Sequence, residues 1–146
     1  HSESAHYEAG QEAVIADLPF GKLGMTVCYD VRFPALFRSL AMHGADFISV
    51  PAAFTKMTGE AHWHVLLRAR AIETGCFIFA PAQAGTHENG RKTYGHSIIV
   101  SPWGRVLADA GLETQIIYAD IDTAQVLMAR RQIPALGHAR HFEPPA

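Results

Sequence analysis

The sequence predicts an α/β domain, or a part of one, in which helices cover a sheet. Short apolar segments of strand length recur along the chain, and two segments with helical periodicity separate the early ones. After the tight-turn signal Asn89-Gly90, three strand-like segments follow one another before a last helical segment. The expected order is therefore β-β-α-β-α-β followed by β-β-β-α, without an internal repeat or a linker.

The first half of the chain supplies the alternating part of this order. Pro34 suits the first turn of one helix, and Gly75 suits the end of the other. The segment 47–54 is almost continuously apolar, which indicates a strand that is buried on both faces. We expect strands at residues 12–18, 22–28, 47–54 and 76–83, with helices at 34–44 and from about 60 to 74.

The second half predicts strands joined by short turns. We expect these strands at residues 95–101, 105–109 and 115–122. A last short helix is expected from residue 123 to about 131, and the tail from Pro134 reads as irregular.

The composition fits one globular unit, since 49% of the 146 residues are hydrophobic and 18% are charged. A net charge of −2 gives no reason to expect nucleic acid or an anionic membrane surface as a partner. No run of about 18 apolar residues exists, so no segment is expected to span a membrane. Two cysteines are too few for a disulfide framework, so we expect a reducing, cytoplasmic compartment. Because the chain begins with His1 rather than Met, we expect a piece of a longer protein.

Cys28 is the first candidate for chemistry. It lies at the expected carboxyl end of a core strand, where open α/β sheets place their ligand crevices, and a helix follows within about six residues. A sharp turn there would expose the thiol and offer the backbone N–H of Tyr29 to a developing oxyanion. Position alone favours the alternative of a buried structural thiol. For Cys76, which begins an apolar strand, we expect a structural role.

Histidines are numerous, with nine in the chain. His62 and His64 flank Trp63, but on a helix they point about 200° apart and cannot share one metal ion, so no metal site is expected. His96 could in principle be the base of a Cys–His pair with Cys28, although a structural role is favoured. We also expect an ion pair between Arg70 and Glu73; the alternative is that these helix charges brace a loop at the site.

Three segments together carry a resemblance to a known family. They are 24–34 (Gly-Met-Thr-Val-Cys-Tyr-Asp-Val-Arg-Phe-Pro), 62–73 (His-Trp through Leu-Arg-Ala-Arg-Ala-Ile-Glu), and 94–104 (Tyr-Gly-His-Ser through Ser-Pro-Trp-Gly). In this order and spacing the chain resembles the nitrilase, or carbon–nitrogen hydrolase, superfamily. Within it, the chain looks like the amidase branch of ω-amidases and deaminated-glutathione amidases. Val31 stands where carbamoylases carry an Arg, which argues against that activity.

The resemblance implies a cysteine hydrolase that cleaves a small carboxylate-bearing amide through a thioester and releases ammonia. Its nucleophile maps to Cys28, and a further catalytic Glu maps to Glu3 in the dipeptide Glu3-Ser4. Ala53, Phe54 and Thr55 are expected to bind substrate. No metal or organic cofactor is implied, and a homodimer or larger homo-oligomer is expected.

The same resemblance predicts an α-β-β-α sandwich that is incomplete in residues 1–146, which would be the C-terminal portion of a single domain. The family also uses a general-base Glu and a Lys, which we expect before residue 1, because no Lys precedes Lys22. A rival reading is therefore a non-catalytic, truncated nitrilase-like domain that serves as a binding or assembly module.

Overall fold

The computed structural model describes residues 5–146 and contains one six-stranded sheet and one two-stranded sheet. The large sheet has the strand order β1-β2-β3-β4-β7-β8, and the small one pairs β5 with β6. The strands are β1 (Val14–Leu18), β2 (Gly21–Met25), β3 (Phe47–Ser49), β4 (Phe77–Ala80), β5 (Ala84–Thr86), β6 (Lys92–Tyr94), β7 (Ile98–Val100) and β8 (Val106–Asp109). The helices are α1 (Pro34–Met42), α2 (Lys56–Thr74) and α3 (Ala124–Gln132), with a short 3₁₀ helix, η2 (Cys28–Arg32), before α1.

The three central strands of the large sheet are parallel. Leu23 of β2 pairs with Phe47 of β3, which in turn pairs with Phe77 of β4, whereas β1, β7 and β8 join antiparallel. Because parallel strands end at the same edge of a sheet, the segments that follow β2, β3 and β4 meet there. Three backbone hydrogen bonds link these segments: Cys28 N donates to Pro51 O at 2.8 Å, Ala52 N to Pro81 O at 2.9 Å, and Gln83 N to Ala52 O at 3.0 Å.

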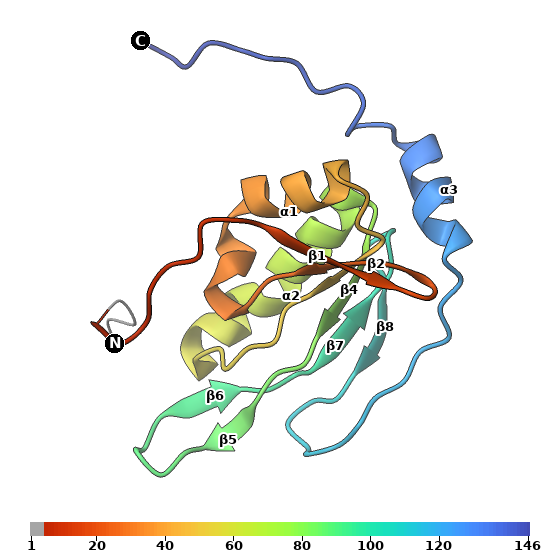
Figure 1. Ribbon diagram of the computed structural model, residues 1–146. Helices are drawn as coiled ribbons and strands as arrows, with labels where there is room; N and C mark the ends of the chain where they lie inside the picture. Colours follow the sequence, from red (N-terminus) through yellow and green to blue (C-terminus); the bar gives the residue numbers. More distant parts are fainter. Residues whose placement is uncertain (1–4) are drawn as a thin grey trace.

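Helices α1 and α2 cover one face of the sheet (Figure 1). The alternation of side chains along the strands assigns each residue to a face. Ile48 and Ile78 pack on the helix side with Trp63, while Phe47 and Phe77 point to the opposite face, where α3 contributes Val126. Burial of Phe47 and Ile48 confirms the expectation that the strand beginning at Phe47 is covered on both faces.

The ends of α2 illustrate how local sequence sets an element. Gly75 adopts φ 64°, and its N–H donates to Ala71 O at 2.8 Å, which is the left-handed helix ending that glycine favours. The helix begins at Lys56, one turn before the predicted start near residue 60, because Thr55 is extended at the cap position and its side chain bonds that of Thr58 at 2.6 Å.

Other element predictions need correction. Strand β2 ends at Met25, so Cys28 lies in η2 rather than in the strand predicted to reach it. Residues 115–122 form no strand in the described chain: alternate side chains such as Ile116 and Tyr118 are exposed, and no neighbouring strand supplies the hydrogen bonds that a ladder needs. The β5–β6 hairpin was not predicted, although its Asn89-Gly90 turn was.

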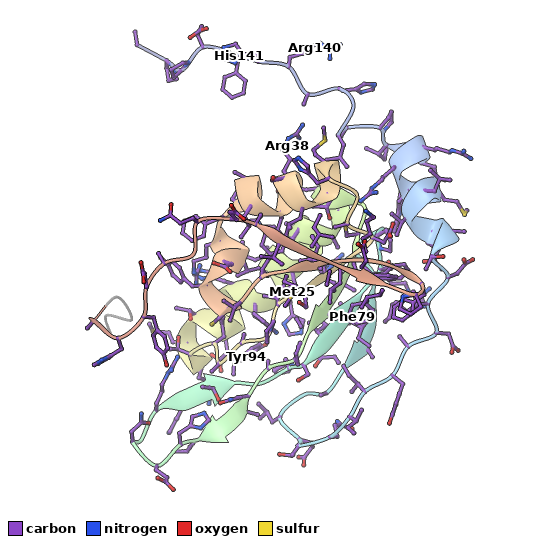
Figure 2. All side chains as sticks on the ribbon, viewed as in Figure 1. Met25, Arg38, Phe79, Tyr94, Arg140 and His141 are labelled. Atoms are coloured by element: carbon purple, nitrogen blue, oxygen red, sulfur yellow. The ribbon has the colours of Figure 1, made fainter. Side chains whose placement is uncertain are left out.

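The chain after α3 runs away from the folded body, and Arg140 and His141 lie out on this tail (Figure 2). Within residues 5–146, no helix has the length and apolar character that crossing a membrane requires. The α/β class is confirmed, whereas the second half of the expected α-β-β-α sandwich stays a prediction.

Candidate active site

Cys28 is the first residue of η2, immediately after the extended Val27. Its φ of 45° lies in the left-handed region, which costs an L-residue about 1–2 kcal/mol. The hydrogen bond of its N–H to Pro51, together with the 2.9 Å bond from Val27 N to the carboxylate of Asp30, holds this sharp turn. The turn leaves the thiol partly exposed at the carboxyl edge of the sheet, the edge that the sequence predicted.

Arg70 supports η2 from the adjacent helix α2. Its Nε donates to the carbonyl oxygen of buried Val31 at 2.9 Å, and its Nη1 makes two 3.0 Å contacts with the carboxylate of Glu73. The predicted ion pair between Arg70 and Glu73 is therefore present. The Arg70 guanidinium also contacts η2, which agrees with the alternative that these helix charges brace a loop at the site.

Two hollows open beside Cys28, with volumes of about 730 Å³ and 560 Å³. Cys28, Ala53 and Arg91 line both of them, and Phe54 and Thr55 line the larger one. The structure thus places all three residues expected to bind substrate around the thiol. They converge because residues 50–54 follow β3 directly beside the segment that follows β2.

Positive charge gathers around the larger hollow. Arg91 extends from the β5–β6 hairpin, and its Nη2 donates to Ala53 O at 2.7 Å. The Arg32 guanidinium lies 5.1 Å from the centre of the Phe54 ring and also lines the hollow. Within residues 5–146, neither arginine forms an ion pair with a carboxylate. Sequence reasoning missed Arg91, because only the hairpin brings it to the site.

Tyr29 follows the thiol, and its ring packs edge-on against Phe33 and is 62% exposed. Among the described residues its backbone N–H has no acceptor. A backbone N–H in that position could donate to an oxyanion that forms on a carbon attacked by the neighbouring sulfur.

Comparison with known proteins places this arrangement in a family. The profile described as "Carbon-nitrogen hydrolase" matches residues 1–131. The chain belongs to the carbon–nitrogen hydrolase family. A curated relative named deaminated glutathione amidase, from Yersinia enterocolitica, is 49% identical over 140 residues; the match covers 96% of this chain and 49% of that protein. The human protein of the same name is 48% identical, with coverage of 84% and 37%. The chain thus spans about half the length, or less, of these relatives.

Solved structures agree with the fold. The NitFhit protein of Caenorhabditis elegans superposes with a TM-score of 0.90 at 45% identity, over 94% of this chain and 34% of that one. A mutant of the amidase from Nesterenkonia sp. AN1 has a TM-score of 0.74 at 31% identity, covering 89% and 49%. That structure carries the acetamide moiety of fluoroacetamide covalently added at the active-site cysteine.

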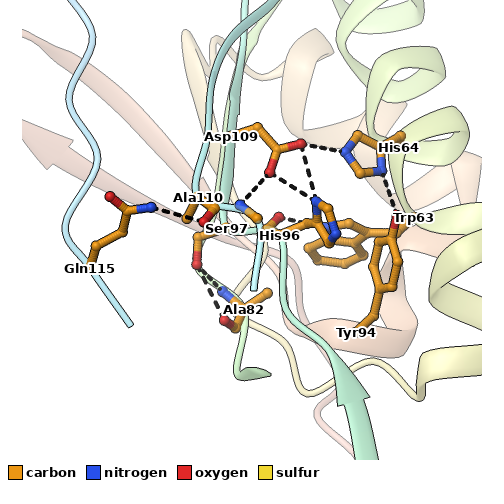
Figure 3. Close-up of polar contacts among 10 residues, drawn as sticks. Trp63, His64, Ala82, Tyr94, His96, Ser97, Asp109, Ala110 and Gln115 are labelled. Atoms are coloured by element: carbon orange, nitrogen blue, oxygen red, sulfur yellow. Dashed lines mark hydrogen bonds and ion pairs between the residues drawn. The ribbon is translucent and has the colours of Figure 1, made fainter. Parts of the chain in front are cut away.

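Glu3, the second predicted catalytic residue of this carbon–nitrogen hydrolase, lies outside the described residues. The alternative of a Cys28–His96 pair is not supported: His96 lines neither hollow beside the thiol, and its Nδ1 donates to the carboxylate of Asp109 at 3.0 Å. Asp109 also accepts from His64 Nε2 at 2.7 Å (Figure 3). No sequence pattern could reveal this group, because three separate elements supply it.

The electrostatics of this second group are dominated by the carboxylate. Burial opposes the charge of Asp109, but hydrogen bonds from His64, the Gly111 N–H and His96 outweigh it and lower the pKa of that carboxyl. Burial, followed by the carboxylates of Asp109 and Glu60, raises the pKa of Tyr94.

Cys76 is buried, as a structural thiol should be. Its Sγ donates to Ala45 O at 3.2 Å and accepts from Arg130 Nη2 at 3.3 Å. Burial raises the pKa of this thiol, against the opposing effects of Thr74 and Arg130. A protonated, enclosed sulfur is a poor nucleophile, so Cys28 is the better candidate.

Proposed function

We propose that the chain carries the nucleophile of an amidase that hydrolyses a small carboxylate-bearing amide and releases ammonia. The observation that carries the proposal is Cys28 itself, a partly exposed thiol on a strained turn that opens into two hollows. The names of the relatives and the covalent adduct at the cysteine of the Nesterenkonia amidase support it. Deaminated glutathione, in the names of the curated relatives, is also a carboxylate-bearing amide, but its secondary amide would release an amine in place of ammonia.

In the proposed reaction the Cys28 sulfur attacks the amide carbonyl carbon, and the C–O double bond opens to an oxyanion that the Tyr29 N–H stabilises. Such a donor typically contributes about 2.7–4 kcal/mol. The intermediate collapses as the C–N bond breaks, and the nitrogen leaves as ammonia after taking up a proton. Water then attacks the thioester, which releases the carboxylic acid and restores the thiol. We propose that Glu3 helps to hold the site, and that the general base and the Lys implied by the family precede it.

The two arginines support the choice of an anionic substrate. A guanidinium that has no carboxylate partner among residues 5–146 favours a ligand that supplies one. Arg91 is the better placed, because it lines both hollows and its bond to Ala53 O fixes it beside the residues expected to bind substrate. We propose that Arg91 binds the substrate carboxylate while Cys28 attacks the distal amide.

The test of the nucleophile uses the natural full-length protein. It measures ammonia release from a panel of short primary ω-amides, and release of the amine product from deaminated glutathione. Cys28→Ala should abolish turnover and covalent labelling by fluoroacetamide. The matched control is Cys76→Ala, which should keep both activities per folded molecule. Labelling that persists in Cys28→Ala would contradict the assignment.

The test of substrate class compares a carboxylate-bearing amide with its neutral analogue of equal length. Arg91→Gln should raise KM roughly tenfold for the anionic substrate, equivalent to about 1.4 kcal/mol, and leave the neutral one unchanged. Lys92→Gln removes the neighbouring charge, which does not line the hollows, and should leave both values unchanged. Equal loss for both substrates in Arg91→Gln would refute carboxylate recognition.

We further propose that residues 1–146 are the C-terminal portion of one carbon–nitrogen hydrolase domain, which acts as a cytoplasmic homodimer or larger homo-oligomer. The match covers about half of each of these two relatives, which supports a portion of a longer domain. The coding sequence upstream of His1 and light scattering of the natural protein test these proposals.

A further inference from the structure

We propose that His64, His96 and Asp109 form a binding site for one divalent transition-metal ion, with Zn²⁺ as the best match. We call these three residues the His–Asp–His cluster. One donor atom from each side chain lies within 4.8 Å of those of the other two. The proposal is independent of the amidase chemistry, because no residue of the cluster lines either hollow beside Cys28.

Three separate elements bring the cluster together. His64 comes from the middle of α2, His96 from the loop before β7, and Asp109 from the end of β8 (Figure 3). His62 and His64 do not form a metal pair, because they point to different sides of the helix. His64 instead meets donors from two other elements, His96 and Asp109.

The donor set suits a borderline transition metal. Two imidazole nitrogens and one carboxylate oxygen are the ligands of several zinc sites that keep a fourth position for water. Mg²⁺ and Ca²⁺ prefer sites built almost entirely from oxygen, so they fit poorly. The side chains are about one-quarter to one-third exposed, which leaves an approach for the ion and for a water ligand.

The distances from the two histidines to Asp109 require only a small adjustment. His64 Nε2 lies 2.7 Å and His96 Nδ1 3.0 Å from Asp109 oxygens. In a tetrahedral zinc site, bonds of about 2.0–2.2 Å place neighbouring donor atoms roughly 3.4 Å apart. The two contacts would therefore open by about half an ångström as the ion takes the place of the shared hydrogens. Each neutral imidazole keeps one proton, which moves to its other nitrogen.

The surrounding contacts already hold the rings in place. His64 Nδ1 lies 3.4 Å from Tyr94 Oη, so a His64 that binds metal through Nε2 can donate its remaining N–H there. The His96 ring stacks on Tyr94 with centroids 4.2 Å apart, and the carbonyl of His96 accepts from Trp63 Nε1 at 2.9 Å. Such outer contacts are what fix ligand orientation in metal sites.

Local charge also favours a cation. The Asp109 carboxylate accepts from both histidines, and among the described residues no Lys or Arg forms an ion pair with it. A bound dication would tie α2 to β8 and to the loop that carries Ser97. Ser97 lines the smaller hollow beside Cys28 and forms hydrogen bonds with the Ala82 backbone. A bound metal would therefore restrict the motion of one wall of that hollow.

The test measures Zn²⁺ binding to the untagged full-length protein by calorimetry at neutral pH, with Co²⁺ absorption as a second probe. We expect one equivalent of Zn²⁺, an increase in Tm with added Zn²⁺, and visible Co²⁺ bands of a four- or five-coordinate site. His64→Gln keeps an N–H for Asp109 but removes the ligand. His64→Gln should lower the Zn²⁺ affinity at least roughly 10- to 100-fold. That is the loss typical when a residue that only hydrogen-bonds a metal ligand is removed. Asp109→Asn should do the same.

His141→Gln is the matched control, because His141 also contacts a carboxylate, that of Glu143 at 3.0 Å, but with only two donors. It should leave the Zn²⁺ affinity and the Co²⁺ spectrum unchanged. Wild-type affinity no higher than that of His64→Gln would overturn the proposal. So would a Co²⁺ spectrum of six oxygen ligands, or equal loss in His141→Gln. Thermal unfolding without metal confirms that each variant is folded.

Discussion

Arg70 donates from its Nε to the main-chain carbonyl of Val31 at 2.9 Å, and this contact joins α2 to the turn that carries Cys28. Both partners are buried, with Val31 at 0% and Arg70 at 5% exposure. The charge of Arg70 is balanced at the surface by Glu73, whose side chain is about half exposed. One guanidinium therefore satisfies a buried carbonyl in η2 and keeps its charge paired.

Replacing Arg70 with Met should destabilise the protein by about 2–3 kcal/mol, because a hydrogen bond from a charged donor is lost and a buried carbonyl is left without a partner. The Arg70→Met substitution should also slow alkylation of Cys28, because η2 loses a hydrogen bond that supports it. Urea unfolding and the rate of thiol labelling measure the two effects.

Arg68→Met is the control for this prediction. Arg68 Nε also donates to a carbonyl, that of Gly104 at 2.7 Å, but Arg68 is exposed, and among the described residues it forms no hydrogen bond with η2. It should cost only about 1 kcal/mol and leave Cys28 reactivity unchanged. Equal loss of reactivity in both variants would show that Arg70 acts through general stability alone.

The left-handed backbone of Cys28 predicts an unusual order of stabilities. Glycine escapes the penalty of about 1–2 kcal/mol at φ 45°, which exceeds its extra entropy cost of about 0.5–1 kcal/mol. Cys28→Gly should therefore be more stable than Cys28→Ala by about 0.5–1 kcal/mol. At Val27, where φ is −142°, the order should reverse, with Val27→Gly the less stable variant. Chemical denaturation of the glycine and alanine variants at both positions measures these stabilities. The same order of stability at Cys28 and at Val27 would argue against backbone strain.

Cys76 predicts a pH dependence at alkaline pH. Burial raises the pKa of this thiol above its ordinary value of 9.0, so the folded state keeps a proton that the unfolded chain releases. The free energy of unfolding should therefore fall as pH rises above about 9, by at most about 1.4 kcal/mol per pH unit from this group. Cys76→Ser does not titrate there, and its stability should fall less steeply. Parallel curves for the two proteins between pH 8 and 10.5 would count against the raised pKa.

The sequence predicted most elements because each has a local cause. Pro34 marks the start of α1 and Gly75 the end of α2, and the apolar runs around Ile48 and Ile78 mark the buried strands. The prediction failed at residues 115–122, where the alternating pattern of a strand is present but no neighbouring strand pairs with it. Strand propensity is local, whereas a ladder needs a partner that the pattern cannot supply.

The sequence predicted the part of the candidate site that lies at the carboxyl ends of the parallel strands. The position of Cys28 at the carboxyl edge and its company of Ala53, Phe54 and Thr55 follow from parallel strands that end together. Arg91 was not predictable, because the β5–β6 hairpin that carries it back to Cys28 had not been recognised. The His–Asp–His cluster was equally hidden, since His64 and Asp109 are separated by 45 positions.

At Gly59, substitution by alanine should lower the stability of the protein, although alanine has the higher helix propensity. A Cβ at this position in α2 would lie 2.3 Å from Tyr94 Cβ and 2.5 Å from the first ring carbon. Tyr94 cannot move away freely, because its N–H donates to Phe54 O at 2.9 Å. Gly59→Ala should therefore destabilise the protein by about 1–3 kcal/mol through overpacking, although alanine favours a helix by about 1 kcal/mol. Urea unfolding measures the change.

Ala61→Gly, at an exposed position two residues along the same helix, isolates the propensity effect and should cost about 1 kcal/mol. If propensity alone mattered, Gly59→Ala would gain that amount, so the two hypotheses predict opposite signs for one measurement. Because Phe54 lines the hollow beside Cys28, the forced shift of Tyr94 should also change the rate of Cys28 alkylation, whereas Ala61→Gly should not. A stabilised Gly59→Ala variant with unchanged alkylation would mean that α2 and β6 are packed less closely than the contact between Gly59 and Tyr94 requires.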